Sequence, residues 1–150
     1  MRAPLWCEVT RKRLFAGDTR KSNLREHGLL LGRMLAKRII VADDYADTAD
    51  MLALLLENSG HHPVSVAKDG EAALRLALAC RPDVVVLDID MPKMSGPDVA
   101  RAIRHHYGAA RPTLIGISGR HDVTVLLKDG TFDHALRKPL DIGELLQLIG

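Results

Sequence analysis

The fold of this chain is decided by one segment, residues 84–96, which reads Val84-Val85-Val86-Leu87-Asp88-Ile89-Asp90-Met91-Pro92-Lys93-Met94-Ser95-Gly96. It opens with four consecutive apolar residues, too few for a helix and without polar alternation, which is typical of a strand buried on both faces. Asp88 follows where that strand ends, and Pro92 and Gly96 then indicate a loop. Open parallel sheets bind ligands outside the carboxyl ends of their strands, so Asp88 is a candidate functional residue. The structural alternative is a carboxylate that only caps the loop.

The composition is that of one globular domain with a basic extension. The 150 residues are 47% hydrophobic but only 3% aromatic, so the core must be aliphatic. Residues 1–38 contain 10 Lys/Arg and 3 Asp/Glu, a formal charge of +7, whereas residues 39–150 contain 11 and 16, a charge of −5. We therefore divide the chain into an N-terminal extension, residues 1–37, and a folded domain, residues 38–150.

The extension is interpreted as a disordered tail with a helix over residues 23–37. Its basic clusters lack interleaved aromatic residues, which favours a solvated tail over a nucleic-acid-binding arm. Two further alternatives are an Arg-rich transit peptide and a translation start at Met34. For the folded domain, which is acidic, we expect no nucleic-acid partner.

Cysteine usage and hydropathy favour a cytoplasmic protein. Cys7 and Cys80 match no metal or redox spacing, so we interpret both as reduced thiols. No apolar run approaches the ~20 residues that span a bilayer, so we expect no membrane association.

From residue 38 onward, apolar runs that resemble strands alternate with segments of helical periodicity. The expected strands are 38–42, 63–67, 84–87, 112–117 and 132–136, and the expected helices are 46–58, 70–79, 97–106, 121–128 and 141–149. This alternation predicts an α/β fold in which right-handed crossovers join parallel strands and helices cover both faces of the sheet. In the first helix we expect the inward face to contain Met51, Leu52, Leu54 and Leu55.

Polar side chains follow four of the five expected strands. Asp43 and Asp44 follow the first strand and Asp88 the third. Ser118 follows the fourth strand, and Lys138 the fifth. Because the carboxyl ends of parallel strands share one edge of the sheet, we expect these groups to converge.

The chemistry of that constellation points to a cation and a phosphoryl group. Three carboxylates in one small site require a counter-charge. Oxygen ligands without a His or Cys cluster favour a hard cation, and we predict Mg²⁺. A lysine ammonium and a serine hydroxyl suit phosphate oxygens. One carboxylate is then the nucleophile, and Asp88, on the most buried strand, is best placed for that role.

These motifs, in this order, resemble the response-regulator receiver domain of two-component signalling. The resemblance covers about residues 38–149, and it rests on the Asp43-Asp44 pair, the Asp88-x-x-Met91-Pro92-x-Met94-x-Gly96 loop, Ser118 and Lys138-Pro139. It implies a flavodoxin-like fold, with a five-stranded parallel sheet of order 2-1-3-4-5 and five helices.

The resemblance also implies Mg²⁺-dependent phosphoryl transfer to Asp88 from a histidine kinase or a histidine phosphotransfer protein. Lys138 would contact the phosphoryl group, and Ser118 would move toward it on activation. Such a domain catalyses its own aspartyl phosphorylation and dephosphorylation. The implied metal ligands are Asp43, Asp44, Asp88 and the backbone carbonyl of Asp90.

Three features bear on how such a domain would signal. The position three residues before Lys138, usually aromatic in this family, is Ala135, with His134 beside it, so the aromatic part of the switch is missing or replaced. The weakly helical segment 120–130 predicts a loose output face. No residue follows Gly150, so we expect a stand-alone receiver without an output domain.

The Lys138–Pro139 bond is expected to be cis. The chain must deliver the Lys138 ammonium toward Asp88 and turn at once into the last helix, and a cis bond makes that turn tight. Receiver domains typically hold this bond cis, so the resemblance implies the same.

Two other functions are compatible with the sequence. One is a pseudo-receiver, a binding module that never accepts a phosphoryl group. The other is a phosphohydrolase of the haloacid-dehalogenase type, because Asp88-Ile89-Asp90 after an apolar strand resembles the first motif of that family. That family, however, places its acidic pair after the lysine.

Overall fold

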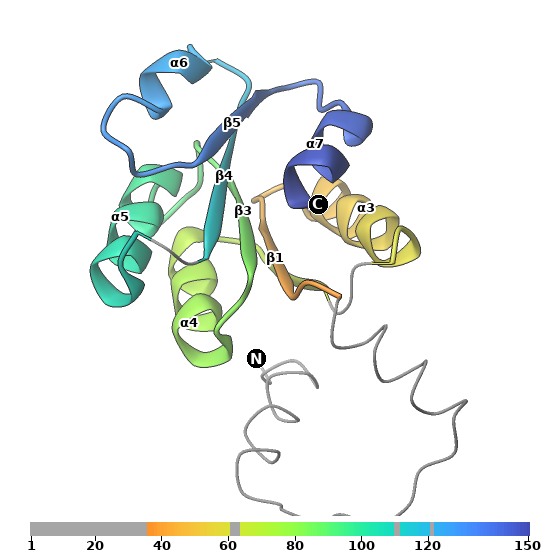
Figure 1. Ribbon diagram of the computed structural model, residues 1–150, viewed down its shortest axis with the longest axis horizontal. Helices are drawn as coiled ribbons and strands as arrows, with labels where there is room; N and C mark the ends of the chain where they lie inside the picture. The colour runs from red at the N-terminus through yellow and green to blue at the C-terminus, as the bar shows by residue number, and fades with distance from the viewer. Residues whose placement is uncertain (1–35, 61–63, 110–111, 121) are drawn as a thin grey trace, which may run out of the picture.

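The computed structural model describes residues 36–60, 64–109, 112–120 and 122–150. They form a five-stranded parallel sheet of order β2-β1-β3-β4-β5, and Figure 1 shows helices on both of its faces. The strands are β1 (Ile39–Ala42), β2 (Val64–Ala67), β3 (Val84–Asp88), β4 (Thr113–Ser118) and β5 (His134–Arg137). The helices are α3 (Ala46–Asn58), α4 (Gly70–Cys80), α5 (Gly96–Tyr107), α6 (Val123–Leu126) and α7 (Ile142–Ile149). The predicted flavodoxin-like fold is confirmed.

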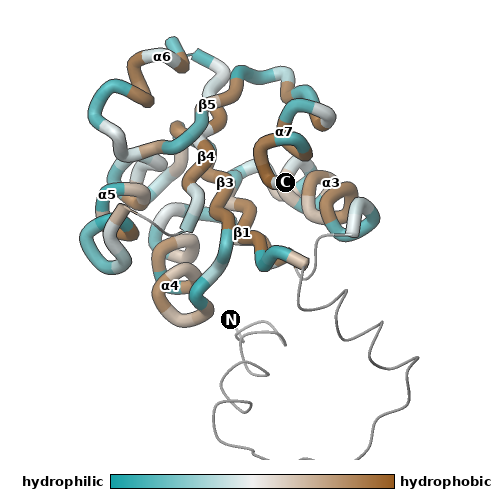
Figure 2. Tube along the Cα trace, viewed as in Figure 1, coloured by the Kyte–Doolittle hydropathy of each residue, from teal (hydrophilic) through white to brown (hydrophobic). Residues whose placement is uncertain are grey.

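The sheet divides the core into two aliphatic clusters, because successive strand residues point to opposite faces. In β1, for example, Ile40 belongs to the cluster under α4 and α5, whereas Ile39 and Val41 belong to the cluster under α3 and α7. Figure 2 shows the hydrophobic residues concentrated in the central strands. Both faces of β3 are buried, which explains its unbroken apolar sequence.

The inward face of α3 differs from the one predicted. Met51 and Leu54 are each 58% exposed and Leu55 is 36% exposed, so only Leu52 of the predicted stripe is buried. The buried face consists of Ala49, Leu52, Ala53 and Leu56. Two of these four residues are alanines, whose small side chains let the helix lie close to the sheet, and hydrophobicity alone did not identify them.

The segment before β5 is less regular than the sequence predicts. In place of a helix over residues 121–128, α6 has only four residues, and none of them is buried. Its Asp122 N-cap accepts a hydrogen bond from the Thr124 N–H at 2.9 Å. Of the helix predicted over residues 23–37, residues 23–35 lie outside the described part of the chain, and residues 36 and 37 are not helical.

Two expectations drawn from composition have different outcomes. Cys80, buried at the end of α4, is disulfide-bonded, so the prediction of a reduced thiol is wrong at this position. Cys7 lies outside the described residues. Within the part of the chain that the structure describes, no helix combines the length and apolarity needed to cross a bilayer.

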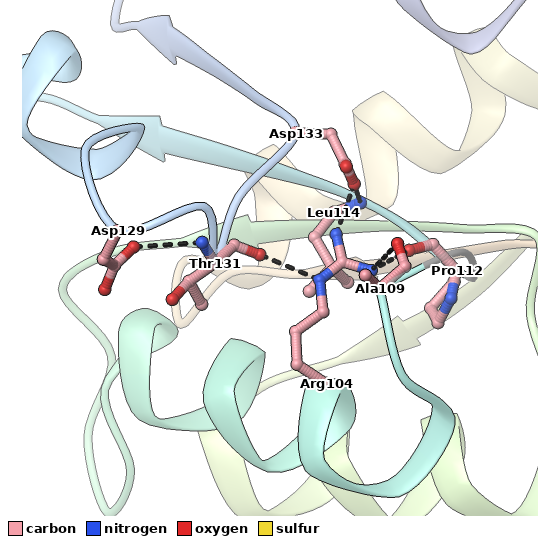
Figure 3. Close-up of polar contacts among 7 residues, drawn as sticks. All are labelled: Arg104, Ala109, Pro112, Leu114, Asp129, Thr131 and Asp133. Atoms are coloured by element: carbon pink, nitrogen blue, oxygen red, sulfur yellow. Dashed lines mark hydrogen bonds and ion pairs between the residues drawn. The ribbon is translucent and has the colours of Figure 1, made fainter.

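Arg104, near the end of α5, forms hydrogen bonds and an ion pair with the segments that lead into β4 and β5 (Figure 3). Its Nε donates to the Thr131 carbonyl at 3.1 Å, and its Nη1 donates to the carbonyls of Ala109 and Pro112 at 3.2 and 2.9 Å. Its Nη2 contacts the Asp133 carboxylate, which also accepts the Leu114 N–H at 2.7 Å. The Arg104 side chain is only 13% exposed, and its hydrogen bonds to the Thr131 and Pro112 carbonyls are partly buried, whereas the Asp133 side chain is 37% exposed.

We predict that Arg104→Lys and Arg104→Met each lower the free energy of unfolding by about 2 kcal/mol, because they leave partly buried acceptors without donors. Lysine keeps the charge but cannot reproduce the planar set of donors. Urea unfolding of the full chain measures the effect.

Arg101→Met on the same helix is the matched control. Among the described residues, the ion pair of Arg101 is with the exposed Asp98, and the Arg101 side chain is 56% exposed, so its removal should leave unfolding nearly unchanged. Equal stability of Arg104→Lys and the wild type would contradict the assigned role of Arg104.

Candidate functional site

Four strands end at one edge of the sheet and bring the predicted residues together. Asp43 directly follows β1, Asp88 is the last residue of β3, and Ser118 is the last residue of β4. Ser118 stands in register with Arg137, so Lys138 leaves β5 at the same edge, and its backbone N–H donates to the Ser118 carbonyl at 2.9 Å. The Lys138–Pro139 bond is cis, as predicted.

The Lys138 ammonium lies between two buried carboxylates. Its Nζ is 3.2 Å from Asp43 Oδ2 and 3.1 Å from Asp88 Oδ2. The carboxylate side chains are 8% and 6% exposed, whereas the Lys138 side chain is 32% exposed. Lysine therefore reaches the site from the solvent side and shares one positive charge between two acids.

The other oxygens of these carboxylates accept backbone hydrogen bonds that fix their orientation. Asp43 Oδ1 accepts the Tyr45 N–H at 2.9 Å, and Asp88 Oδ1 accepts the Asp90 N–H at 3.3 Å. Asp44 is exposed, yet one carboxylate oxygen from each of Asp43, Asp44 and Asp88 lies within 4.8 Å of the other two. Three hard oxygen donors at this spacing fit a small divalent cation.

Burial raises the pKa of the Asp88 carboxyl above its ordinary value, and the neighbouring Asp43 carboxylate raises it further. Hydrogen bonding and charge attraction from Lys138 act in the opposite direction. Burial lowers the pKa of Lys138, but the Asp88 and Asp43 carboxylates together outweigh burial and raise it. The lysine thus stays charged, while the ionised form of Asp88 depends on nearby positive charge.

The remaining predicted residues occupy different surroundings. Ser118 is fully buried, and its Oγ accepts the Arg120 N–H at 3.4 Å. Asp90 is exposed in the loop after β3. Ala135 lies in β5 opposite Gly116, and both it and His134 are half-buried.

One pair near the site was not predicted from the sequence. Lys93, in the loop after β3, contacts Asp69 before α4 at 2.9 Å. The two residues are 24 positions apart and no local pattern joins them. The one sequence signal at Asp69 is its position directly before the helix predicted over residues 70–79, and it is the N-cap of α4.

The fold and the site define the class of this protein. A doubly wound sheet of this order, with acidic residues, a hydroxyl and a lysine at the carboxyl ends of its strands, is the arrangement of a receiver domain. The family model of the response regulator receiver domain matches residues 39–150. The chain belongs to this family of two-component signalling proteins.

Individual relatives agree with the family model. The chain is 36% identical over 112 residues to the DNA-binding response regulator MtrA of Mycobacterium tuberculosis (strain ATCC 25618 / H37Rv), covering 75% of this chain and 48% of MtrA. It is 39% identical over 111 residues to protein-glutamate methylesterase/protein-glutamine glutaminase 6 of Anaeromyxobacter dehalogenans (strain 2CP-C), covering 71% and 31%. The chain thus spans half or less of the length of these relatives.

Among solved structures, the response regulator TrrA of Thermotoga maritima, in complex with Mg(2+)-BeF, is 30% identical. Its TM-score is 0.67, with 75% of this chain and 96% of TrrA covered. A response regulator receiver domain protein from Clostridium thermocellum is also 30% identical, with a TM-score of 0.68 and coverages of 77% and 91%.

We predict that Lys138→Met lowers the free energy of unfolding of metal-free protein by about 1–3 kcal/mol at pH 7.5, between the values typical of exposed and buried pairs. The substitution leaves two buried carboxylates facing each other. Burial raises the pKa of Asp88, and protonation of this carboxyl removes the charge that Lys138 stabilises, so the difference from wild type should shrink as the pH falls toward 4.5.

Urea unfolding at both pH values measures this dependence. Lys68→Met is the control, because Lys68 is exposed and lies next to the site without an ion pair among the described residues. A loss of stability that stays constant with pH would contradict the electrostatic role of Lys138.

Proposed function

We propose that Asp88 accepts a phosphoryl group and that Mg²⁺ is required for its acceptance. The observation that carries the proposal is the position of Asp88, a buried carboxylate at the end of the central strand, 3.1 Å from the Lys138 ammonium and beside two further acids. A carboxylate that only capped a loop would need neither the lysine nor the additional carboxylates.

In the proposed reaction, a carboxylate oxygen of Asp88 attacks the phosphorus of the donor. The new P–O bond forms as the bond from phosphorus to the donor's leaving group breaks: a histidine nitrogen in a kinase, or an acetate oxygen in acetyl phosphate. The Lys138 ammonium, already placed between Asp43 and Asp88, is positioned to stabilise charge on the phosphoryl oxygens. Attack by water later releases inorganic phosphate and restores the carboxylate.

The residues that would hold Mg²⁺ are Asp43, Asp44 and Asp88, together with the backbone carbonyl of Asp90. The proximity of the three carboxylates supports this set, and the TrrA structure in complex with Mg(2+)-BeF is consistent with it. With one lysine against three carboxylates, the site has an excess of negative charge that a divalent cation would neutralise. When bound, Mg²⁺ would stabilise negative charge on the transferring phosphoryl group.

The proposed donor is a histidine kinase or a histidine phosphotransfer protein, which suits a cytoplasmic receiver. We propose that the receiver itself does not bind nucleic acid, because its charge is negative. The readout is proposed to involve Ser118, whose hydroxyl contacts the Arg120 N–H and would exchange that contact for a phosphoryl oxygen. With Ala135 in β5, this movement would proceed without a partner aromatic ring.

We predict that wild-type protein incubated with acetyl phosphate and Mg²⁺ gains about 80 Da, the mass of one phosphoryl group, and that Asp88→Asn does not. The amide preserves the shape of the side chain but is not a nucleophile. Intact-mass spectrometry measures the adduct.

Asp90→Asn is the matched control, because Asp90 lies two residues away and only its backbone is proposed to act. It should still accept the group. Adduct formation on Asp88→Asn would disprove the assignment of the acceptor, and no adduct on the wild type would favour the pseudo-receiver.

Mg²⁺ at millimolar concentration should raise the melting temperature of the wild type, since a ligand that binds only the folded state stabilises it. Asp44→Asn and Asp88→Asn should each reduce this rise. Differential scanning fluorimetry with and without Mg²⁺, using Asp47→Asn as a control outside the proposed ligand set, gives the comparison. An unchanged wild-type melting curve would contradict the metal site.

A further inference from the structure

An ion pair connects the loop after β3 to the N-terminus of α4. Lys93 Nζ lies 2.9 Å from Asp69 Oδ2, and the other oxygen of Asp69 accepts the Ala72 N–H at 2.8 Å. Asp69 therefore caps α4 and binds the loop with the same carboxylate. The pKa of Asp69 is lowered, first by the hydrogen bond from Ala72 and next by Lys93, so the carboxylate is ionised at neutral pH.

Two glycines let this loop lie directly against its supports. A Cβ at Gly70 would be 1.9 Å from the Met94 carbonyl oxygen, and a Cβ at Gly96 would be 2.3 Å from the Asp88 carbonyl oxygen. The Gly96 N–H also donates to the Ile89 carbonyl at 3.0 Å. The loop is thus held between the acceptor strand at one end and α4 at the other.

Lys93 adopts a backbone conformation that is uncommon for a lysine. Its φ is 66°, in the left-handed region that non-glycine residues enter only at an energetic cost. The side chain is 56% exposed and the Asp69 side chain only 17%, so the lysine extends over the surface to reach a partly buried acid. The ion pair with Asp69 offsets part of the backbone cost.

We propose that Asp69 and Lys93 are positioning residues that set the affinity of the acidic site for Mg²⁺. The ion pair holds the loop against α4, and the loop carries the backbone carbonyl of Asp90, the fourth proposed metal ligand. Residues that orient metal ligands without touching the metal commonly influence metal affinity. This inference rests on the metal site of the proposed function and adds to it a residue pair outside the site.

Mg²⁺ titration of the full chain, followed by the amide chemical shifts of Asp90 and Gly96, tests the proposal. Asp69→Asn and Lys93→Met should each raise the Mg²⁺ concentration for half-saturation by about threefold to tenfold. The double variant should bind Mg²⁺ no more weakly than the single variant with the lower affinity, because both substitutions break the same ion pair. Lys93→Arg keeps the charge and should restore affinity to within about twofold of wild type.

Amide hydrogen exchange of the metal-free protein gives a second measurement of how firmly the loop is held. Protection of the Gly70 and Gly96 amides should fall in Asp69→Asn and Lys93→Met and return in Lys93→Arg. If phosphoryl uptake is observed, its rate at saturating Mg²⁺ should stay within about twofold of wild type. A displaced metal ligand should change the affinity for Mg²⁺ more than the rate of phosphoryl transfer.

Glu71→Gln is the matched control. It removes the same charge from the first turn of α4, and Glu71 is exposed without an ion pair among the described residues. Equal effects of Glu71→Gln and Asp69→Asn would overturn the proposal in favour of a general field effect, as would unchanged Mg²⁺ affinity in both single variants. Mg²⁺ binding without phosphoryl uptake would overturn only the proposed function, whereas wild-type protein that binds no Mg²⁺ would overturn both.

Discussion

One ammonium group, that of Lys138, is shared between the buried carboxylates at the functional edge of the sheet. Lys138 contacts Asp43 and Asp88 from the solvent side, while both carboxylates are almost fully buried. A single positive charge cannot compensate two buried acids and the exposed Asp44 beside them. The site therefore has an excess of negative charge. Among the described residues, no buried polar side chain lacks a hydrogen-bond partner. This imbalance supports the proposed cation site.

The rest of the fold keeps those charges in place. Each functional group stands at the end of a strand whose apolar residues pack in one of two aliphatic clusters, so the backbone there has little freedom to separate like charges. At the far end of β5, Arg104 fixes the segment that enters the strand. The position of Lys138 thus depends on contacts at both ends of one short strand.

Much of this arrangement could be predicted from the sequence, because strand alternation and the order of polar residues are local signals. The convergence of Asp43, Asp88 and Lys138 followed from parallel topology alone. The inward face of α3 could not be predicted in the same way, since alanines, rather than the larger Met51 and Leu54, contact the sheet. The contacts of Arg104 with Thr131 and of Lys93 with Asp69 join residues more than 20 positions apart, so no local sequence pattern predicts them.

The brevity of α6 has a consequence for how the domain transmits a signal. A helix of four residues that buries no side chain loses little when it opens, so its local opening free energy is far below that of the sheet. The Ser118 hydroxyl is bonded to the Arg120 N–H, just ahead of this segment. A change at Ser118 would then alter how often the segment is ordered, rather than move a rigid body between two positions. Under the proposed readout, the output would be graded by the fraction of molecules in which this segment is ordered.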